Sequence, residues 1–478
     1  MNKKTFILPI AVLSGLLSLV GCGNSDVVRT DNEIYVTVYD GGYGTAWIDQ
    51  VAKDYEAKTG VHVNWNADQS ILDRMTSELD NPQSDIYMSH DITWQEYAEL
   101  GQLEQLDDLY NSQVEGTGKT FKQRLCAGAE EVSRLEDGHY YKVCYTQGAG
   151  GLVYNVDMFR EHGWSVPTTY EELKTLCQRI VDEKIKTEDL ELVVPIAWSG
   201  KDREYYWDYI VFEWWAQLGG MDAINKYKAF LGDDGKYSTG YQVYNPATNH
   251  KEFKQAYEKW HELIAMNPSF SEDNAQSQLL VTANTMFASG QAAMIPYAQW
   301  AKYEIQHNSG VTFDFDIAMM KTPKISATAQ DYNYNVGFGD SMIIPANIPE
   351  TSKALAKDFL RYLAGEEACK TFVDKARGAF LAFDYSTVNL GNLLNDTYIA
   401  SVYSKLTTCT NFNLVSMNPV AYINSSAIMP WIGNTYYYTK AFSNPSNTDY
   451  QATAVCDAIY TTASNSWSTW MRKAHISD

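Results

Sequence analysis

Motifs that mark the common catalytic and metal sites are absent from this chain of 478 residues. It has no C-x-x-C, H-E-x-x-H, G-x-S-x-G or H-x-E…C-x-x-C pattern. This excludes the usual zinc, redox, serine-hydrolase and deaminase sites, so we expect neither a metal nor a cofactor. The carboxylate pairs that hydrolyse glycans are spaced in three dimensions rather than along a chain. An extracytoplasmic glycan hydrolase therefore stays open as an alternative.

Basic residues are also scarce, since 37 Lys and Arg stand against 59 Asp and Glu, for a net charge of −22. A balance this acidic argues against nucleic acid and against anionic membrane surfaces as partners. It permits a neutral solute such as a sugar. It also permits a cationic solute such as a polyamine, because aromatic side chains can hold cations.

No apolar run is long enough for a good membrane-spanning helix. The longest, Phe6–Val20, follows Lys3 and Lys4 and is interrupted by Pro9 and Gly15, which is the pattern of a secretory signal over residues 1–21. Leu19-Val20-Gly21-Cys22 resembles a bacterial lipobox. That resemblance implies that Cys22 carries a diacylglycerol anchor, with a polar tether over residues 22–32.

Six cysteines follow Cys22, and none of them is in a metal-binding or redox spacing. An even number of cysteines outside the cytoplasm permits disulfides. Cys126 and Cys144 are the best candidate pair. Cys177 lies on an apolar helix face and is interpreted as a small buried residue.

The chain alternates strand and helix patterns, which predicts an α/β fold. A length of 478 residues exceeds what one hydrophobic core usually holds, so we expect two lobes. Aromatic residues make up 13% of the chain, which fits either large cores or a surface that stacks on sugar rings. The predicted strands include Ile34–Tyr39, Val61–Trp65, Asp85–Met88, Tyr140–Tyr145, Val193–Trp198 and Gly337–Pro345. Predicted helices end at Gly60 and at Gly219-Gly220, and one is predicted to open at Glu204–Trp207.

The stretch Met286–Trp300 organises our interpretation. Gly290 is expected to end a helix, and Ala292–Ile295 to form a short buried strand. Pro296 is expected to end that strand because proline cannot donate to a sheet ladder. Tyr297 and Trp300 then follow at the carboxyl end of the strand, where α/β folds place ligands.

Several segments together resemble one family. They are Met286–Trp300, Ser84–Leu109, Leu152–Phe159, the capping-box helix start Pro167–Leu173 and the amphipathic Ser352–Leu363. This set is similar to the extracytoplasmic solute-binding proteins of carbohydrate ABC transporters, the maltodextrin-binding type included.

The resemblance implies a two-lobe periplasmic-binding-protein fold with hinge crossings and a mostly helical C-terminal region. Lobe one would comprise residues 33–143 and 322–378, and lobe two residues 144–321 and 379–478. The chain would be no enzyme but a monomeric, lipid-anchored protein outside the cytoplasm. It would capture a carbohydrate, of oligosaccharide size, and deliver it to ABC permease subunits.

Candidate ligand-binding residues are polar or aromatic and lie at predicted strand ends or in loops. A sugar needs polar groups at its edge and aromatic plates on its faces. The candidates are Tyr43, His90, Asp91, Gln147, Trp198, Asp202, Tyr205, Tyr206, Trp300 and Trp431. Asp91 has a rival role as a helix cap and Trp431 as an anchor of the tail. Trp207 fits a core better than a site. Gln147 stands where the family carries an acid, which is a departure from its pattern.

Overall fold

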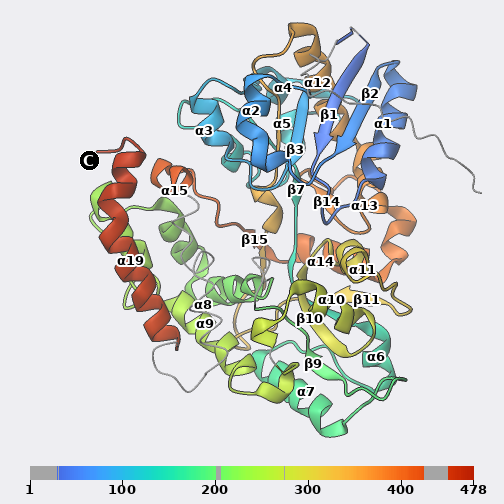
Figure 1. The fold of residues 1–478 in the computed structure, drawn as a ribbon, viewed down its shortest axis with the longest axis vertical. Coiled ribbons are helices and arrows are strands. Elements are labelled where there is room, and N and C mark those ends of the chain that lie inside the picture. The colour runs from blue at the N-terminus through green and yellow to red at the C-terminus, as the bar shows by residue number, and fades with distance from the viewer. Residues whose placement is uncertain (1–28, 31, 201–205, 274, 425–450, 478) are drawn as a thin grey trace, which may run out of the picture.

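The computed structural model describes residues 29–30, 32–200, 206–273, 275–424 and 451–477. Two groups of helices and strands lie one above the other, and the chain through β7 (Thr146–Gln147) runs between them (Figure 1). Each group has its own sheet. The expected two-lobe α/β fold is therefore present.

Five strands form the first sheet. Their order is β2 (His62–Ala67), β1 (Glu33–Val38), β3 (Ile86–Ser89), β13 (Ser341–Ile343) and β6 (Val143–Cys144). The strands β1, β2 and β3 are parallel, and β13 runs antiparallel to both of its neighbours. The parallel strands are joined by helices, as this connection requires. Gly60, in a left-handed conformation, ends the first of these helices as the sequence predicts.

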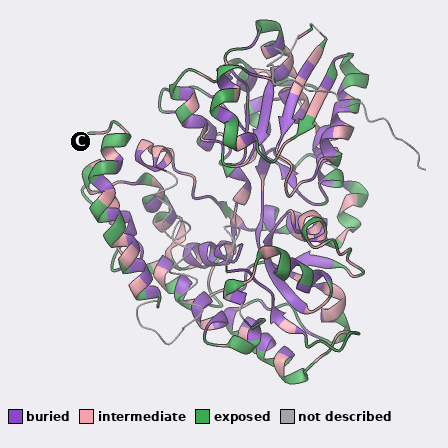
Figure 2. Cartoon of the chain, in the orientation of Figure 1, coloured by how far each residue is buried: buried purple, intermediate pink, exposed green. Residues whose placement is uncertain are grey.

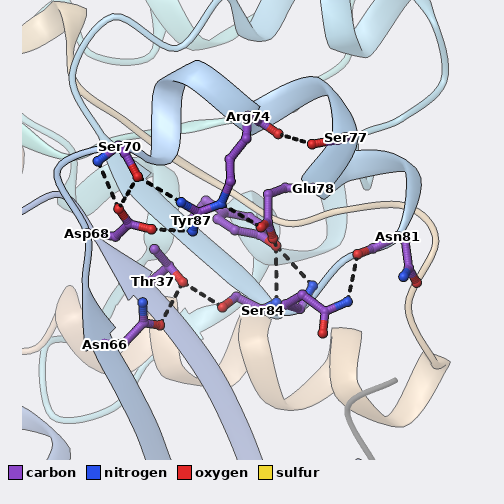
Figure 3. Close-up of polar contacts among 11 residues, drawn as sticks. Thr37, Asn66, Asp68, Ser70, Arg74, Ser77, Glu78, Asn81, Ser84 and Tyr87 are labelled. Carbon is purple, nitrogen blue, oxygen red and sulfur yellow. Dashed lines mark hydrogen bonds and ion pairs between the residues drawn. The ribbon is translucent and has the colours of Figure 1, made fainter. Parts of the chain in front are cut away.

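Polar side chains fix the connection between β2 and β3 against this sheet (Figure 3). Thr37 on β1 bonds Asn66 at 2.8 Å and Ser84 at 2.7 Å. The Tyr87 hydroxyl donates to Glu78 at 2.8 Å and accepts the Ser84 N–H at 3.1 Å. These polar side chains thus find their hydrogen-bond partners within the same lobe.

The second sheet has the order β11 (Ile317–Met319), β8 (Gly150–Asn155), β10 (Ala292–Ala298) and β9 (Val194–Ile196). Every residue of β10 is buried, as the apolar run predicts. The strand continues through Pro296 to Ala298, so the expected end at Pro296 is wrong. The neighbouring strand β9 ends at Ile196, which pairs with Met294. Beyond Met294 this edge of β10 has no described partner strand, so no ladder hydrogen bond requires the N–H that Pro296 lacks.

The helices of the first group are α1 (Ala46–Thr59), α2 (Met75–Asp80), α3 (Trp94–Glu99), α4 (Asp107–Asn111), α5 (Phe121–Arg124), α12 (Glu350–Leu363) and α13 (Glu366–Lys375). The helices of the second group are α6 (Val156–Glu161), α7 (Tyr170–Glu183), α8 (Asp208–Ala229), α9 (Lys251–Ile264), α10 (Leu280–Ala288) and α11 (Ala301–Ser309). Thr169 and Glu172 form the predicted capping box of α7.

Helix α8 corrects one expectation and confirms another. It begins at Asp208 rather than within Glu204–Trp207. The predicted helix end at Gly219-Gly220 is confirmed, because Gly220 has φ 65° and ψ −174°, outside the helical region, and the chain kinks there between two helical segments. Glycine permits this conformation, and the second segment continues to Ala229.

Two short strand pairs lie between the sheets. β7 pairs with β14 (Phe380–Leu381), and β12 (Tyr332–Tyr334) pairs with β15 (Thr410–Phe412). The Gly148 N–H donates to the Asn335 side chain at 2.9 Å. A Cβ on Gly337 would lie 2.5 Å from the Thr146 carbonyl oxygen, so only glycine allows the crossing segments to approach this closely.

The C-terminal region is mostly helical where it is described. It contains α14 (Thr397–Thr408), α15 (Pro419–Ile423) and the long α19 (Ala452–Lys473), which runs along one side of the second group (Figure 1). Buried residues concentrate in the two sheets and on the inner helix faces (Figure 2). Among the described helices, none has the length and apolar character needed to cross a bilayer.

The cysteines of the described residues are all free thiols, so the expected Cys126–Cys144 bridge is wrong. Cys144 is fully buried, and its Sγ donates to the Ala129 carbonyl at 3.5 Å. Cys177 is buried on α7, as its apolar helix face predicts. These thiols thus behave as small core residues.

Candidate ligand-binding site

The loop after β1 brings the first group of elements against the second. Gly42 lies so close to Trp300, at the start of α11, that a Cβ on Gly42 would stand 2.8 Å from the indole Cγ. Gly44 approaches Tyr303 equally closely, at 2.6 Å. Small residues in this loop therefore allow aromatic side chains from the two groups to meet.

Tyr43, in the same loop, is held by a buried acid. Its hydroxyl donates to Asp340 Oδ2 at 2.7 Å and lies 2.8 Å from Thr146 Oγ1, which also donates to Asp340 at 2.9 Å. Asp340 directly precedes β13, and Thr146 belongs to the crossing strand β7. The acid thus links the loop after β1, the first sheet and the crossing segment.

Trp300 connects to a second acid through Tyr206. The Trp300 indole N–H donates to the Tyr206 hydroxyl at 3.2 Å, and that hydroxyl donates to Glu304 at 2.9 Å. Tyr297, buried within β10, donates to the same Glu304 oxygen at 2.6 Å. The Tyr43 ring stands edge-on to Trp300, with centroids 5.9 Å apart and planes at 85°. The two hydrogen-bonded sets are therefore in contact through their rings.

Two further tyrosines and one further acid complete the arrangement. The Tyr209 ring lies 5.7 Å from Tyr206 and 5.6 Å from Tyr334. Asp208, the first residue of α8, is more than nine-tenths buried. We call the set the junction cluster. It consists of Tyr43, Thr146, Tyr206, Asp208, Tyr209, Trp300, Glu304, Tyr334 and Asp340.

Burial shapes the charges of the junction cluster. Desolvation raises the pKa of the Asp340 carboxyl, opposed by its bond from Tyr43 and by the charge of His90. Desolvation also raises the pKa of Asp208, to about 7. The pKa of the Tyr43, Tyr206 and Tyr209 hydroxyls is raised well above the ordinary value, again by burial first. These hydroxyls are thus neutral and remain hydrogen-bond donors at physiological pH.

The structure gathers some of the predicted site residues here and leaves others elsewhere. Tyr43, Tyr206 and Trp300 belong to the junction cluster. His90 and Asp91 follow β3, with His90 Nδ1 3.0 Å from Asp91 Oδ2, and the charges of both act on Asp340. Asp202, Tyr205 and Trp431, with the lipidation candidate Cys22, lie outside the described residues.

Two other candidates have mainly structural contacts. The Gln147 amide donates to the carbonyls of Leu381 at 3.1 Å and Phe383 at 2.6 Å, which ties β7 to β14. Trp198 is 2% exposed and packs edge-on to Trp260 in the core of the second group. Both side chains therefore support the lobes and their crossing rather than offering an open face.

Sequence reasoning missed six members of the junction cluster, namely Thr146, Asp208, Tyr209, Glu304, Tyr334 and Asp340. The sequence does offer a signal for Asp340, which is an acid beside glycines and directly before a buried strand. Strand ends are where α/β folds place ligands. Glu304 carried a weaker one, four residues after Trp300 on one helix face. The others come together only through the tertiary fold.

The chemistry of this arrangement favours binding. Indole and phenol rings can cover the faces of a pyranose, and carboxylates with phenolic hydroxyls can hold its edge. Within the described residues, no group of three His, Cys, Asp or Glu side chains is placed to hold a metal ion. The site is thus a largely buried aromatic and acidic cluster at the meeting of two lobes.

Comparison with protein families supports this picture. The family model described as bacterial extracellular solute-binding protein matches residues 41–369, more than half of the chain. A curated relative, the diacetylchitobiose binding protein NgcE of Streptomyces coelicolor, is 25% identical over 151 residues. That match covers 31% of this chain and 32% of NgcE, so the chain is aligned to about a third of the relative's length.

Solved structures share the fold across almost the whole chain. The apo form of RafE from Streptococcus pneumoniae gives a TM-score of 0.63 at 16% identity, covering 92% of this chain and 99% of RafE. The GacH receptor of Streptomyces glaucescens gives 0.61 at 15% identity, covering 90% and 98%. A RafE complex with raffinose gives 0.62 at 18% identity, covering 91% and 99%. At these identities the likeness establishes the fold alone.

Proposed function

This chain belongs to the bacterial extracellular solute-binding protein family, and we propose that it captures a carbohydrate, of oligosaccharide size, for import by an ABC transporter. The observation that carries the proposal is the junction cluster, where Tyr43 and Trp300 meet from two lobes beside Asp340 and Glu304. Rings for the sugar faces and acids for its hydroxyls then come from both sides. The relatives support the same class of solute, since RafE is seen with raffinose, GacH with acarbose, and NgcE is named for diacetylchitobiose.

Isothermal titration calorimetry against a panel of mono- and oligosaccharides tests this function. We expect saturable binding of at least one oligosaccharide and no change in that ligand on long incubation. Release of shorter sugars would instead favour a glycan hydrolase. A panel in which only non-sugar solutes bind would overturn the carbohydrate assignment.

The proposed binding site includes Tyr43, His90, Asp91, Tyr206 and Trp300 together with the rest of the junction cluster, while Asp202, Tyr205 and Trp431 stay predictions. Lobe one then comprises residues 33–143 and 322–378, and lobe two residues 144–321 and 379–478. Closure of two lobes over a solute buries surface from both. Small-angle scattering should show a smaller radius of gyration with the bound sugar. An unchanged radius at saturation would point to a rigid, preformed site.

The proposed attachment of the protein to the membrane rests on the lipobox-like sequence Leu19–Cys22. We propose that the lipid on Cys22 anchors a monomer to the outer face of the cell membrane, beside the permease. Cys22→Ala should move the protein from the membrane fraction to the soluble fraction while its melting temperature stays the same, because the tether precedes β1. A variant that remains membrane-bound would count against lipidation.

A further inference from the structure

Asp208 is a buried carboxylate with an unmatched oxygen. Its side chain is more than nine-tenths buried, and Oδ1 has no hydrogen-bond partner among the described residues. Burying a charge without a partner costs several kcal/mol, far more than a buried neutral group of the same shape. A residue kept at such a cost needs an explanation in the bound state.

The position of Asp208 in its helix does not supply that explanation. It stands in the first turn of α8, where the helix dipole favours an acid. That effect is worth about 0.3–1 kcal/mol, and about 2 kcal/mol at most. It accounts for an acid at this end of the helix but falls short of the cost of removing the acid from water.

A second acid lies near the same tyrosine. The charges of Asp208 and Asp340, which come from different lobes, both raise the pKa of the Tyr209 hydroxyl. Asp340 accepts its hydrogen bonds from Tyr43 and Thr146 through Oδ2 alone. The charges of two carboxylates therefore act on one phenol, and Oδ1 of Asp208 has no described partner.

The described residues provide no Lys or Arg ion pair for Asp208 or Asp340, although the charge of His90 acts on Asp340. Lys142 feels the charge of Asp340, but its ammonium is buried and donates to the Phe338 carbonyl at 3.0 Å. Lys405 is paired with Glu213 at 2.9 Å. Within the described residues Asp208 therefore has no Lys or Arg to match its charge, while Lys201 and Arg203 lie outside them.

We propose that the solute supplies this cation, and that Asp208 receives a protonated amine, so that the preferred ligand is an amino sugar with a free amine. This inference rests on the proposed carbohydrate function and narrows it. Neutral and N-acetylated sugars could donate a hydrogen bond to Asp208 but would leave its charge uncompensated, and anionic sugars would add repulsion. The surrounding tyrosines would hold the ammonium by their ring faces as well as their hydroxyls.

The test pairs each neutral glucose-, galactose- or mannose-based sugar with its 2-amino and 2-acetamido counterparts, and it adds spermidine. Calorimetry on the wild-type chain at pH 7 should show the amine-bearing sugar binding at least about tenfold more tightly than either counterpart. Equal or weaker binding of the amine would overturn the inference while leaving the carbohydrate function intact. Binding of no member of the panel would count against both proposals.

The variant Asp208→Asn tests whether Asp208 causes the preference for the amine-bearing sugar. It should reduce binding of the amine about tenfold or more and reduce binding of the neutral sugar by a clearly smaller factor. Asp222→Asn is the matched control, because it removes the same charge from an exposed position of the same helix and should change neither ligand. Equal losses for amine and neutral sugars in Asp208→Asn would show a general rather than an amine-specific role. Tight spermidine binding that needs Asp208, without any sugar binding, would keep the amine site and reject the carbohydrate function.

Proton exchange gives a readout beyond affinity. Burial raises the pKa of Asp208 to about 7, so ionising it beside an ammonium should release about half a proton at pH 7. Titrations in buffers of different ionisation enthalpy measure this release, which Asp208→Asn should abolish. The other titratable groups around it are Asp340, Glu304, Tyr209, Tyr334, Asp91 and His90. Undiminished release in the variant would assign the proton to one of them and overturn the role of Asp208.

Discussion

Lys405 and Glu213 form an ion pair, with Nζ 2.9 Å from Oε2, and their side chains are only 1% and 0% exposed. The pair joins α14 to α8. Lys405 also donates to the Gly150 carbonyl at the start of β8, and Glu213 accepts the Tyr334 N–H at 2.8 Å. One buried pair thus connects the C-terminal region, the second sheet and the crossing strand β12.

Removing one partner of this pair should destabilise the fold strongly. Lys405→Met leaves the Glu213 carboxylate buried and alone, which costs about 3–5 kcal/mol of unfolding free energy. Replacing both, as Lys405→Met with Glu213→Leu, should cost much less because no charge remains buried. Urea unfolding measures the three values. A double variant no more stable than the single one would show that the remaining hydrogen bonds, rather than the charges, matter most.

The exposed pair Lys226–Asp233 is the matched control for that experiment. Its side chains are 45% and 55% exposed. Asp233→Asn should therefore change the unfolding free energy by less than about 1 kcal/mol. A comparable loss at this exposed pair would mean that burial does not set the energy of the buried one.

Asp208 should make the free protein less stable as the pH rises. Burial raises its pKa in the folded state to about 7 from the ordinary value of 3.8. Between these values the folded state binds more protons than the unfolded state, so its stability is greatest at low pH and falls as the pH rises toward 7. Thermal melts of wild type and Asp208→Asn from pH 4 to 8 should diverge in this window, with the variant relatively more stable at pH 7. Parallel curves would show that Asp208 titrates normally.

The local elements were largely predictable from the sequence, because their signals are short-range. Gly60 ends α1, and Thr169 with Glu172 caps α7, since each depends on residues within one turn. Gly220 likewise breaks the helical conformation of α8, as expected. Pro296 misled for a tertiary reason, because it lies where the neighbouring strand has ended. That neighbour is not visible in the local sequence.

The candidate site divides in the same way. Tyr43 and Trp300 could be nominated because a glycine-rich turn and a strand end are local features. Asp208 and Asp340 lie 132 residues apart in numbering and meet around Tyr209 only when both lobes are folded. Trp198 looked like a binding residue at the end of a strand, yet the aromatic core of its lobe encloses it. Burial of this kind depends on long-range packing.

Gly42→Ala should disturb the contact between the lobes. Its added Cβ would stand 2.8 Å from Cγ and 2.9 Å from Cβ of Trp300, so the loop or the indole must move. We expect at least about tenfold weaker solute binding and about 1–3 kcal/mol of lost stability from overpacking. Gly339→Ala is the control, since a Cβ added there would have no neighbouring atom within 4 Å. An unaffected affinity in Gly42→Ala would mean that this contact is not maintained when solute binds.

Trp300→Ala separates binding from folding. The indole is half-buried, bonded to Tyr206 and edge-on to Tyr43, rather than enclosed by a core. Loss of a stacking aromatic at a binding hot spot removes about 2 kcal/mol or more of binding free energy, which is roughly a thirtyfold loss of affinity.

Two other tryptophans provide the controls. Trp47 is 1% exposed in the first lobe, and Trp47→Ala should instead cost about 3–5 kcal/mol of folding stability. Trp65, half-buried on the edge strand β2, provides the matched control for a partly exposed indole. Trp65→Ala should lower the melting temperature about as much as Trp300→Ala while leaving calorimetric affinity unchanged. If Trp300→Ala melts like Trp47→Ala yet binds like wild type, Trp300 is a structural residue and the solute lies elsewhere in the junction.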